Sequence, residues 1–176
     1  MSLILGGSLS TIVFGGLAAL SAASNAVKSR VIVQPEVIRA LSSSGAPWLI
    51  AKTYDDLIMD EASLTTFYVD RKLPPYHEHG LVRGIELNES MEMLSSRLME
   101  EGATHEEARI ISLAVGSFHD RLILLRRNAR DLARRVGLHP SSPLVALTEA
   151  LNRNVIRLDD YMSILTNLFR MGRGVI

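Results

Sequence analysis

Residues 104–136 read THEEARIISLAVGSFHDRLILLRRNARDLARRV and decide the fold that the sequence predicts. Thr104 and Glu107 have the spacing of a capping box, in which each side chain accepts a hydrogen bond from a backbone N–H of the first turn. Apolar residues then recur at alternating steps of three and four as far as Val136, and Gly137 follows as a stop signal. The stretch therefore predicts one long helix, over residues 105–136, with an apolar seam along one side.

The seam predicts a bundle core rather than an isolated two-stranded coil, because further apolar residues widen the stripe. We expect the following seam residues to mediate assembly: Ile111, Val115, Phe118, Leu122, Leu125 and Leu132. Shorter helices are predicted to begin near residues 35, 47, 88, 143 and 159, and no segment has a strand-like alternation. The expected fold class is all-α, a helical bundle with a four-helix-like core and an apolar N-terminal helix.

The chain divides into three predicted segments. Residues 1–29 form an apolar helix rich in small residues, residues 30–84 a helical segment with a Pro-rich loop, and residues 85–176 the bundle core. No charged residue occurs before Lys28, and small residues recur at every fourth position. This predicted N-terminal packing face consists of Gly7, Thr11, Gly15, Ala19 and Ala23. Such a face lets another helix approach closely, so the segment is an assembly helix, a membrane-inserting helix or a signal peptide.

Composition limits the chemistry that the chain can perform. A chain of 176 residues is long enough to form a stable hydrophobic core without disulfides or a structural metal. The absence of Cys excludes thiolate catalysis and disulfide bonds. The net charge is zero, yet residues 51–110 carry six basic and thirteen acidic side chains, whereas residues 111–176 carry ten arginines and five acidic side chains. This asymmetry favours complementary contacts between copies, or pairing of the two segments within one chain.

Catalytic motifs are missing from the sequence. His77 and His79 are one residue apart in the Pro-rich loop and need a third ligand, for which His105, Glu106 or His119 are the candidates. The spacing of a zinc protease is absent, and so are a nucleophile elbow and a phosphate-binding loop. We therefore expect no enzyme, no catalytic residue, no metal site and no cofactor.

A possible basic contact face consists of Arg126, Arg130 and Arg134, which are spaced four residues apart. It is either a phosphate-binding face or a solvated face that pairs with the acidic segment at residues 86–107. No aromatic residue is interleaved with the arginines, so bases have no stacking platform. We do not expect direct nucleic-acid binding.

The sequence resembles the outer nucleocapsid shell protein of cystoviruses, the enveloped double-stranded RNA bacteriophages. Residues 15–58, GGLAALSAASNAVKSRVIVQPEVIRALSSSGAPWLIAKTYDDLI, carry the resemblance together with RLDDY at residues 157–161. The resemblance implies an all-helical subunit, trimers with exchanged helices and an icosahedral layer over an inner capsid layer. It also implies a role in crossing the host's inner membrane and calcium-favoured assembly. The Pro-rich loop around His77 departs from the family pattern.

The expected function is that of a structural, self-assembling subunit of a viral nucleocapsid shell, with aid to membrane penetration as a further expected role. Its partners would be copies of itself, the inner capsid layer and a lipid membrane, and it would reside in the virion and, during assembly, in the host cytoplasm. The alternative is a membrane-anchored protein with one N-terminal transmembrane helix and a soluble helical domain.

Overall fold

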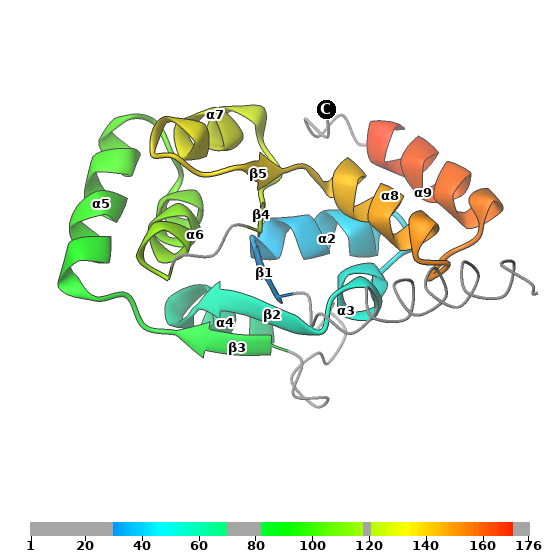
Figure 1. Cartoon of the computed structure of the whole chain (residues 1–176), viewed down its shortest axis with the longest axis horizontal. Coiled ribbons are helices and arrows are strands. Elements are labelled where there is room, and N and C mark those ends of the chain that lie inside the picture. Colours follow the sequence, from blue (N-terminus) through cyan, green and yellow to red (C-terminus); the bar gives the residue numbers. More distant parts are fainter. Residues whose placement is uncertain (1–29, 70–81, 118–120, 171–176) are drawn as a thin grey trace, which may run out of the picture.

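The computed structural model describes residues 30–69, 82–117 and 121–170 (Figure 1). Within these ranges the chain forms five strands and eight helices. The strands are β1 (Arg30–Val33), β2 (Asp56–Asp60), β3 (Val82–Ile85), β4 (Leu122–Ile123) and β5 (Pro140–Ser141). The helices are α2 (Pro35–Ser43), α3 (Leu49–Thr53), α4 (Glu61–Val69), α5 (Glu89–Glu100), α6 (His105–Gly116), α7 (Arg127–Arg135), α8 (Pro143–Asn152) and α9 (Leu158–Arg170).

The strands form one parallel sheet in the order β3-β2-β1-β4-β5. Ile32 at the centre pairs with Ile58 of β2 on one side and with Leu122 of β4 on the other. The predicted all-α bundle is therefore wrong, and the fold is α/β. The physical reason is that parallel strands covered on both faces are apolar throughout and do not alternate. The short runs at residues 31–33 and 57–59 have this property, and all six of these side chains are buried.

The predicted long helix over residues 105–136 is also wrong. Helix α6 ends at Gly116, residues 122–123 form β4, and a separate helix, α7, begins at Arg127. Leu122 and Leu125 have the spacing of a helical seam. In the structure residues 122–125 are instead a strand and the segment after it, and all four side chains are 4% exposed or less. Burial on both faces of the sheet thus overrides the helical spacing that the same residues have.

Local helix signals are confirmed. Thr104 and Glu107 form the capping box at the start of α6. Asn88 caps α5 by accepting a hydrogen bond from the Met91 amide, and α2 and α8 begin with proline. Gly102, which follows α5, has the positive φ that glycine adopts without strain. These signals lie within one turn of the chain, so they act in the same way in a bundle and in an α/β fold.

Helices cover the sheet on both sides of its central strands (Figure 1). Helix α6 packs against β1 and β2, α4 against β2 and β3, and both α7 and α8 contact β5. Helices α5 and α6 pack against each other at the left of the view, while α2, α8 and α9 lie at the right. The sheet takes strands from both the 30–84 and the 85–176 segments.

The order of the strands places a switch point between β1 and β4. The chain moves from β1 outward to β2 and β3, then returns to the other side of β1 and continues through β4 to β5. In open parallel sheets ligands bind beside the carboxyl ends of the strands at such a point. In the described ranges no helix is long and apolar enough to cross a bilayer. The predicted N-terminal helix and its packing face lie outside those ranges.

Candidate functional site

The switch point itself is filled by Gln34, which directly follows β1 and is 4% exposed. Its side-chain Oε1 accepts a hydrogen bond from the Leu125 amide at 3.1 Å, and its own amide donates to the Ile123 carbonyl at 3.1 Å. These two bonds join the exits of β1 and β4. The crevice between the central strands is thus closed by an amide side chain of the protein.

The start of α2, beside this crevice, holds a carboxylate of the protein. Glu106 accepts a hydrogen bond from the Glu36 amide at 3.3 Å and lies 3.4 Å from the Arg39 guanidinium. The positive end of a helix dipole and a basic side chain together favour an anion at this position. Glu106 therefore occupies the place beside β1 where an anionic ligand of a parallel α/β protein would bind.

Two buried carboxylates near the carboxyl ends of the strands are each paired with an arginine. Asp60 ends β2 and is fully buried, and its Oδ1 accepts hydrogen bonds from Arg109 at 2.7 Å and from the Ser63 amide at 3.2 Å. Glu107 is 1% exposed and pairs with Arg126. Burial opposes ionisation of Glu107, but the contact with Arg126 and the bonds from Thr104 hold its pKa below its usual value. Both pairs neutralise charge inside the fold.

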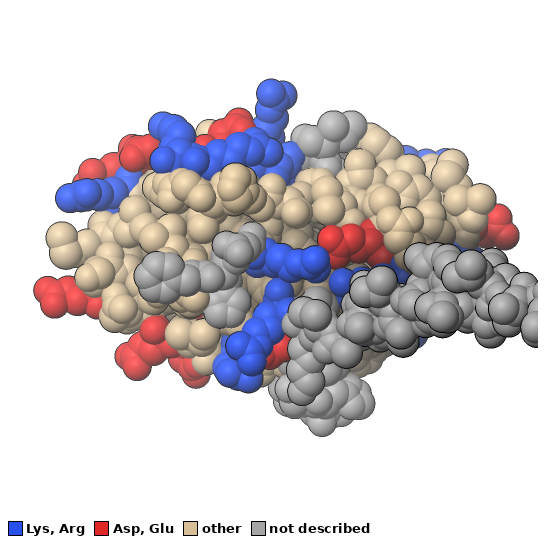
Figure 2. Space-filling model, in the orientation of Figure 1, with Lys and Arg blue, Asp and Glu red and all other residues tan. Residues whose placement is uncertain are grey.

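A hollow of about 430 Å³ lies at the far end of the same edge, where α7, β5 and the start of α8 meet. Basic and hydroxyl side chains dominate its lining, and we call it the arginine hollow. It is lined by Arg127, Arg130, Asp131, Arg134, Pro140, Ser141, Ser142 and Val145. Figure 2 shows Lys and Arg side chains gathered along the top of the molecule, where Figure 1 places α7.

Two of the three arginines of the hollow pair with one carboxylate, and the third is held by backbone carbonyls. Asp131 lies 2.6 Å from Arg134 and 3.9 Å from Arg127. Arg130 is 4% exposed, and its Nη1 donates to the carbonyls of Leu124 and Leu125 at 3.2 and 2.6 Å. Burial, and then the like charge of Arg134, lowers the pKa of Arg130. The lining therefore places several positive charges close together, and the charge of Arg130 is held in place.

The start of α8 adds to this charge. The helix has ten residues and begins with Pro143, one residue after the end of β5. The side chain of the intervening N-cap residue, Ser142, makes no capping hydrogen bond. The Ser141 and Ser142 hydroxyls are donors and acceptors at the wall of the hollow. The arrangement of guanidinium groups, hydroxyls and the positive end of a helix matches the chemistry of an anion.

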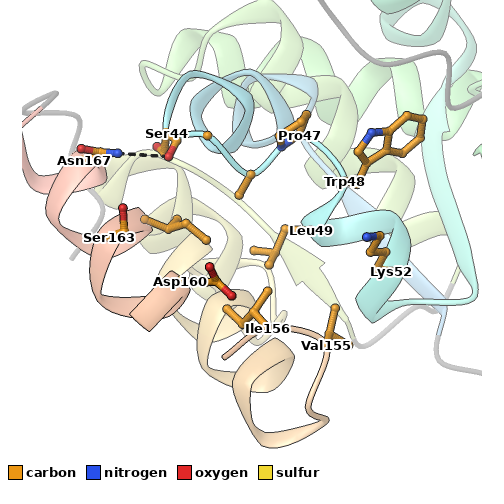
Figure 3. Close-up of a pocket in the computed structure, with 13 residues that line it drawn as sticks. Ser44, Pro47, Trp48, Leu49, Lys52, Val155, Ile156, Asp160, Ser163 and Asn167 are labelled. Atoms are coloured by element: carbon orange, nitrogen blue, oxygen red, sulfur yellow. Dashed lines mark hydrogen bonds between the residues drawn. The ribbon is translucent and has the colours of Figure 1, made fainter. Parts of the chain in front are cut away.

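A second hollow, of about 360 Å³, lies between the turn after α2 and helices α3 and α9 (Figure 3). Leu49 and Ile156 line it, and at one end the Asn167 amide donates to the Ser44 carbonyl at 3.2 Å. Its charged residues are Lys52 and Asp160, which are of opposite sign. This mixed lining favours no class of charged ligand.

The structure brings together only part of the predicted basic face. Arg130 and Arg134 both line the arginine hollow, whereas Arg126 precedes α7 and pairs with Glu107. The sequence prediction omitted Arg127, Ser141 and Ser142. The signal for the serines is their position directly before Pro143, since serine followed by proline is typical of a helix start.

The predicted assembly seam is divided among three elements. Ile111 lies in α6, Leu122 in β4 and Leu132 in α7, and all three are fully buried. Leu125 is also buried, Val115 is half-buried, and Phe118 falls outside the described residues. The loop with His77 and His79 lies outside them too. In residues 30–69, 82–117 and 121–170 no group of three or more His, Asp or Glu side chains could hold a metal ion.

Comparison with known proteins identifies no relative. No family model matches the chain, and no curated protein and no solved structure matches it at a significant level. A functional conclusion therefore depends on the geometry of the described residues.

Proposed function

We propose that this protein binds a phosphate-bearing ligand in the arginine hollow. The observation that carries the proposal is that three arginines and one carboxylate line the same hollow, beside the start of a helix. Guanidinium groups hold phosphate through paired N–H···O bonds, and helix starts favour negative charge.

Like-charge repulsion within the hollow supports an anionic ligand. Asp131 balances one of the three positive charges, so the lining keeps a net charge of about two. The Leu124 and Leu125 carbonyls hold Arg130 in place, and Arg134 lies close enough to repel it. A bound dianion would reduce this repulsion and gain charge-assisted hydrogen bonds.

The size of the hollow favours a ligand larger than phosphate alone. Its volume of about 430 Å³ is in the range of small-molecule sites. A nucleotide and a segment of single-stranded nucleic acid both carry phosphate attached to a sugar and a base. Because the two share the same contact chemistry, binding experiments must distinguish them.

The test is calorimetric titration of the full chain with pyrophosphate, with a mononucleotide and with a single-stranded oligonucleotide. We expect binding that weakens as salt rises, and that falls about tenfold or more when Arg127→Gln and Arg134→Gln are combined, because charged hydrogen bonds are lost. Arg97→Gln is the control, since Arg97 is an exposed arginine on α5 that does not line the hollow.

The outcomes separate the ligand classes. Tight binding of the mononucleotide assigns the hollow to a small ligand, whereas binding that strengthens with oligonucleotide length assigns it to a nucleic-acid backbone. If Arg97→Gln and the double variant lost equal binding affinity, binding would depend on the overall charge of the protein, and this result would refute the proposal.

The viral shell function stays a prediction, and so do the absence of enzyme activity, the predicted partners and the location in the virion. The resemblance implied an all-helical subunit, and the parallel sheet differs from that implication. The N-terminal packing face, on which both the shell and the membrane-anchor alternatives depend, lies outside the described residues. For this reason the proposal above rests on the arginine hollow alone.

A further inference from the structure

Helix α9 carries an apolar stripe that the described fold leaves exposed. Leu158, Met162 and Phe169 are 61%, 53% and 48% exposed, and Leu165 between them is half-buried. Their spacing of four, three and four residues places all four side chains within about 60° of one another around the helix. Single exposed apolar residues are ordinary, but a continuous stripe marks an interaction surface.

The stripe borders the face that α9 packs into its own fold. Ile164 and Leu168 are buried in the core, and Leu165 packs partly against it, whereas Leu158, Met162 and Phe169 stay exposed. Asp160 and Ser163 line the hollow drawn in Figure 3, and no residue of the stripe does. A partner on the stripe would therefore leave both the core and that hollow unchanged.

The order of side chains along the stripe is self-complementary. If two copies of α9 lie antiparallel around a two-fold axis between residues 163 and 164, Leu158 faces Phe169 of the second copy. Met162 then faces Leu165 of the second copy. Each large side chain meets another apolar one, as a symmetric interface requires.

Charges beside the stripe favour the same arrangement. Asp159 lies near the start of α9 and Arg170 at its end, on the same flank of the stripe. Among the described residues neither of them forms an ion pair. Antiparallel packing makes this flank of one copy meet the same flank of the other, so Asp159 of each copy lies near Arg170 of its partner. Parallel packing would leave the two flanks on opposite sides of the interface, and these pairs would not form.

We propose that α9 is the contact of a homodimer, with two α9 helices packed antiparallel along the stripe of Leu158, Met162, Leu165 and Phe169. One pair of thirteen-residue helices buries less than a standard interface of about 1,600 Å². The dimer is accordingly weak, with a dissociation constant on the order of micromolar. It is independent of what the arginine hollow binds.

Sedimentation of the full chain across the micromolar range tests the proposal. The wild-type chain should pass from monomer to dimer as concentration rises. Met162→Glu should shift this transition to at least tenfold higher concentration without altering the circular dichroism spectrum, because Met162 is exposed in the monomer. Met93→Glu is the matched control, since Met93 is 56% exposed on α5, and it should dimerise like the wild type.

A charge exchange tests the antiparallel orientation. Asp159→Arg should weaken the dimer by opposing two arginines, and adding Arg170→Asp should restore it by exchanging the two charges. Failure of the second change to restore the dimer would overturn the orientation. A wild-type chain that stays monomeric, or an association that Met162→Glu leaves unchanged, would overturn the interface itself.

Discussion

The Nη1 atom of Arg130 lies 2.6 Å from the carbonyl oxygen of Leu125, so an arginine of α7 is anchored to the exit of strand β4. The same guanidinium also donates to the Leu124 carbonyl at 3.2 Å. These bonds satisfy backbone acceptors that the short strand leaves unpaired by the sheet, and they hold positive charge at the edge of the arginine hollow. One side chain thereby contributes both to stability and to the proposed binding site.

Arg130→Met should destabilise the fold by about 1–3 kcal/mol, because the substitution leaves buried carbonyl groups without a donor while it keeps most of the packed stem. The free energy of unfolding from urea titration measures the loss. Arg134→Met is the control, since the Arg134 side chain is 55% exposed and should cost less than about 1 kcal/mol. An equal decrease in the free energy of unfolding for the two variants would contradict the anchoring role of Arg130.

Glu107→Gln should remove a stabilising contribution that depends on pH. The pKa of Glu107 is lowered in the fold, so its contribution is present above the glutamate pKa of the unfolded chain and is lost as pH falls through the lower folded value. We expect the variant to be less stable than the wild type by about 2 kcal/mol at neutral pH. The two unfolding free energies should converge as pH falls below about 4.

If the difference in the free energy of unfolding between the wild type and Glu107→Gln stayed constant from neutral to acidic pH, the stabilising role of ionised Glu107 would be contradicted. Glu106→Gln provides the comparison, because Glu106 is the neighbouring glutamate and is only half-buried. Its substitution should lower the free energy of unfolding at neutral pH by less than Glu107→Gln does.

Tyr54 should resist deprotonation. Burial, followed by the hydrogen bond that its hydroxyl donates to Glu149 at 2.8 Å, raises its pKa above the ordinary value. The raised pKa stabilises the fold below the unfolded tyrosine value of about 10, and this contribution is lost as pH rises further. Ultraviolet titration of the folded chain to about pH 11 should give the same tyrosinate signal for the wild type and for Tyr54→Phe. A larger signal in the wild type would show that Tyr54 ionises normally.

Leu122→Ala should cost about 2–5 kcal/mol, because the side chain is fully buried beside the central strand of the sheet. Met93→Ala, at a 56% exposed position, is the control and should change stability by less than about 0.5 kcal/mol. Thermal or urea unfolding measures both. A small cost at Leu122 would be inconsistent with β4 as a core strand.

The sequence predicts those helix ends that have local causes, whereas the end of α6 at Gly116 and the start of α7 at Arg127 are not predicted. The capping box of Thr104 and Glu107 acts between residues three positions apart, and Gly102 ends α5 through its own φ. Strands β1, β2 and β4 escape prediction because their stability depends on partners far along the chain. Ile32, for example, pairs with a residue 90 positions later, and no local spacing reveals this.

The residues of the arginine hollow also divide into those that local sequence predicts and those that depend on distant parts of the chain. The spacing of Arg126, Arg130 and Arg134 predicts a shared helix face, yet α7 begins only at Arg127. Glu107, which is buried and distant in the sequence, then draws Arg126 away from the hollow. Ser141 and Ser142 reach the arginines because β5 pairs with β4, a contact that depends on the whole sheet. Residue types alone thus indicate basic chemistry, and the fold selects the residues that share a site.

Nuclear magnetic resonance of the isotope-labelled chain, titrated with pyrophosphate at low salt, tests the arginine hollow most directly. The proposal predicts saturable shifts confined to the amides of residues 127–134, 141, 142, 144 and 145, and the loss of these shifts when Arg127→Gln and Arg134→Gln are combined. Shifts that centre on the start of α2 around Glu36, or small unsaturable shifts at exposed arginines over the whole surface, would contradict it.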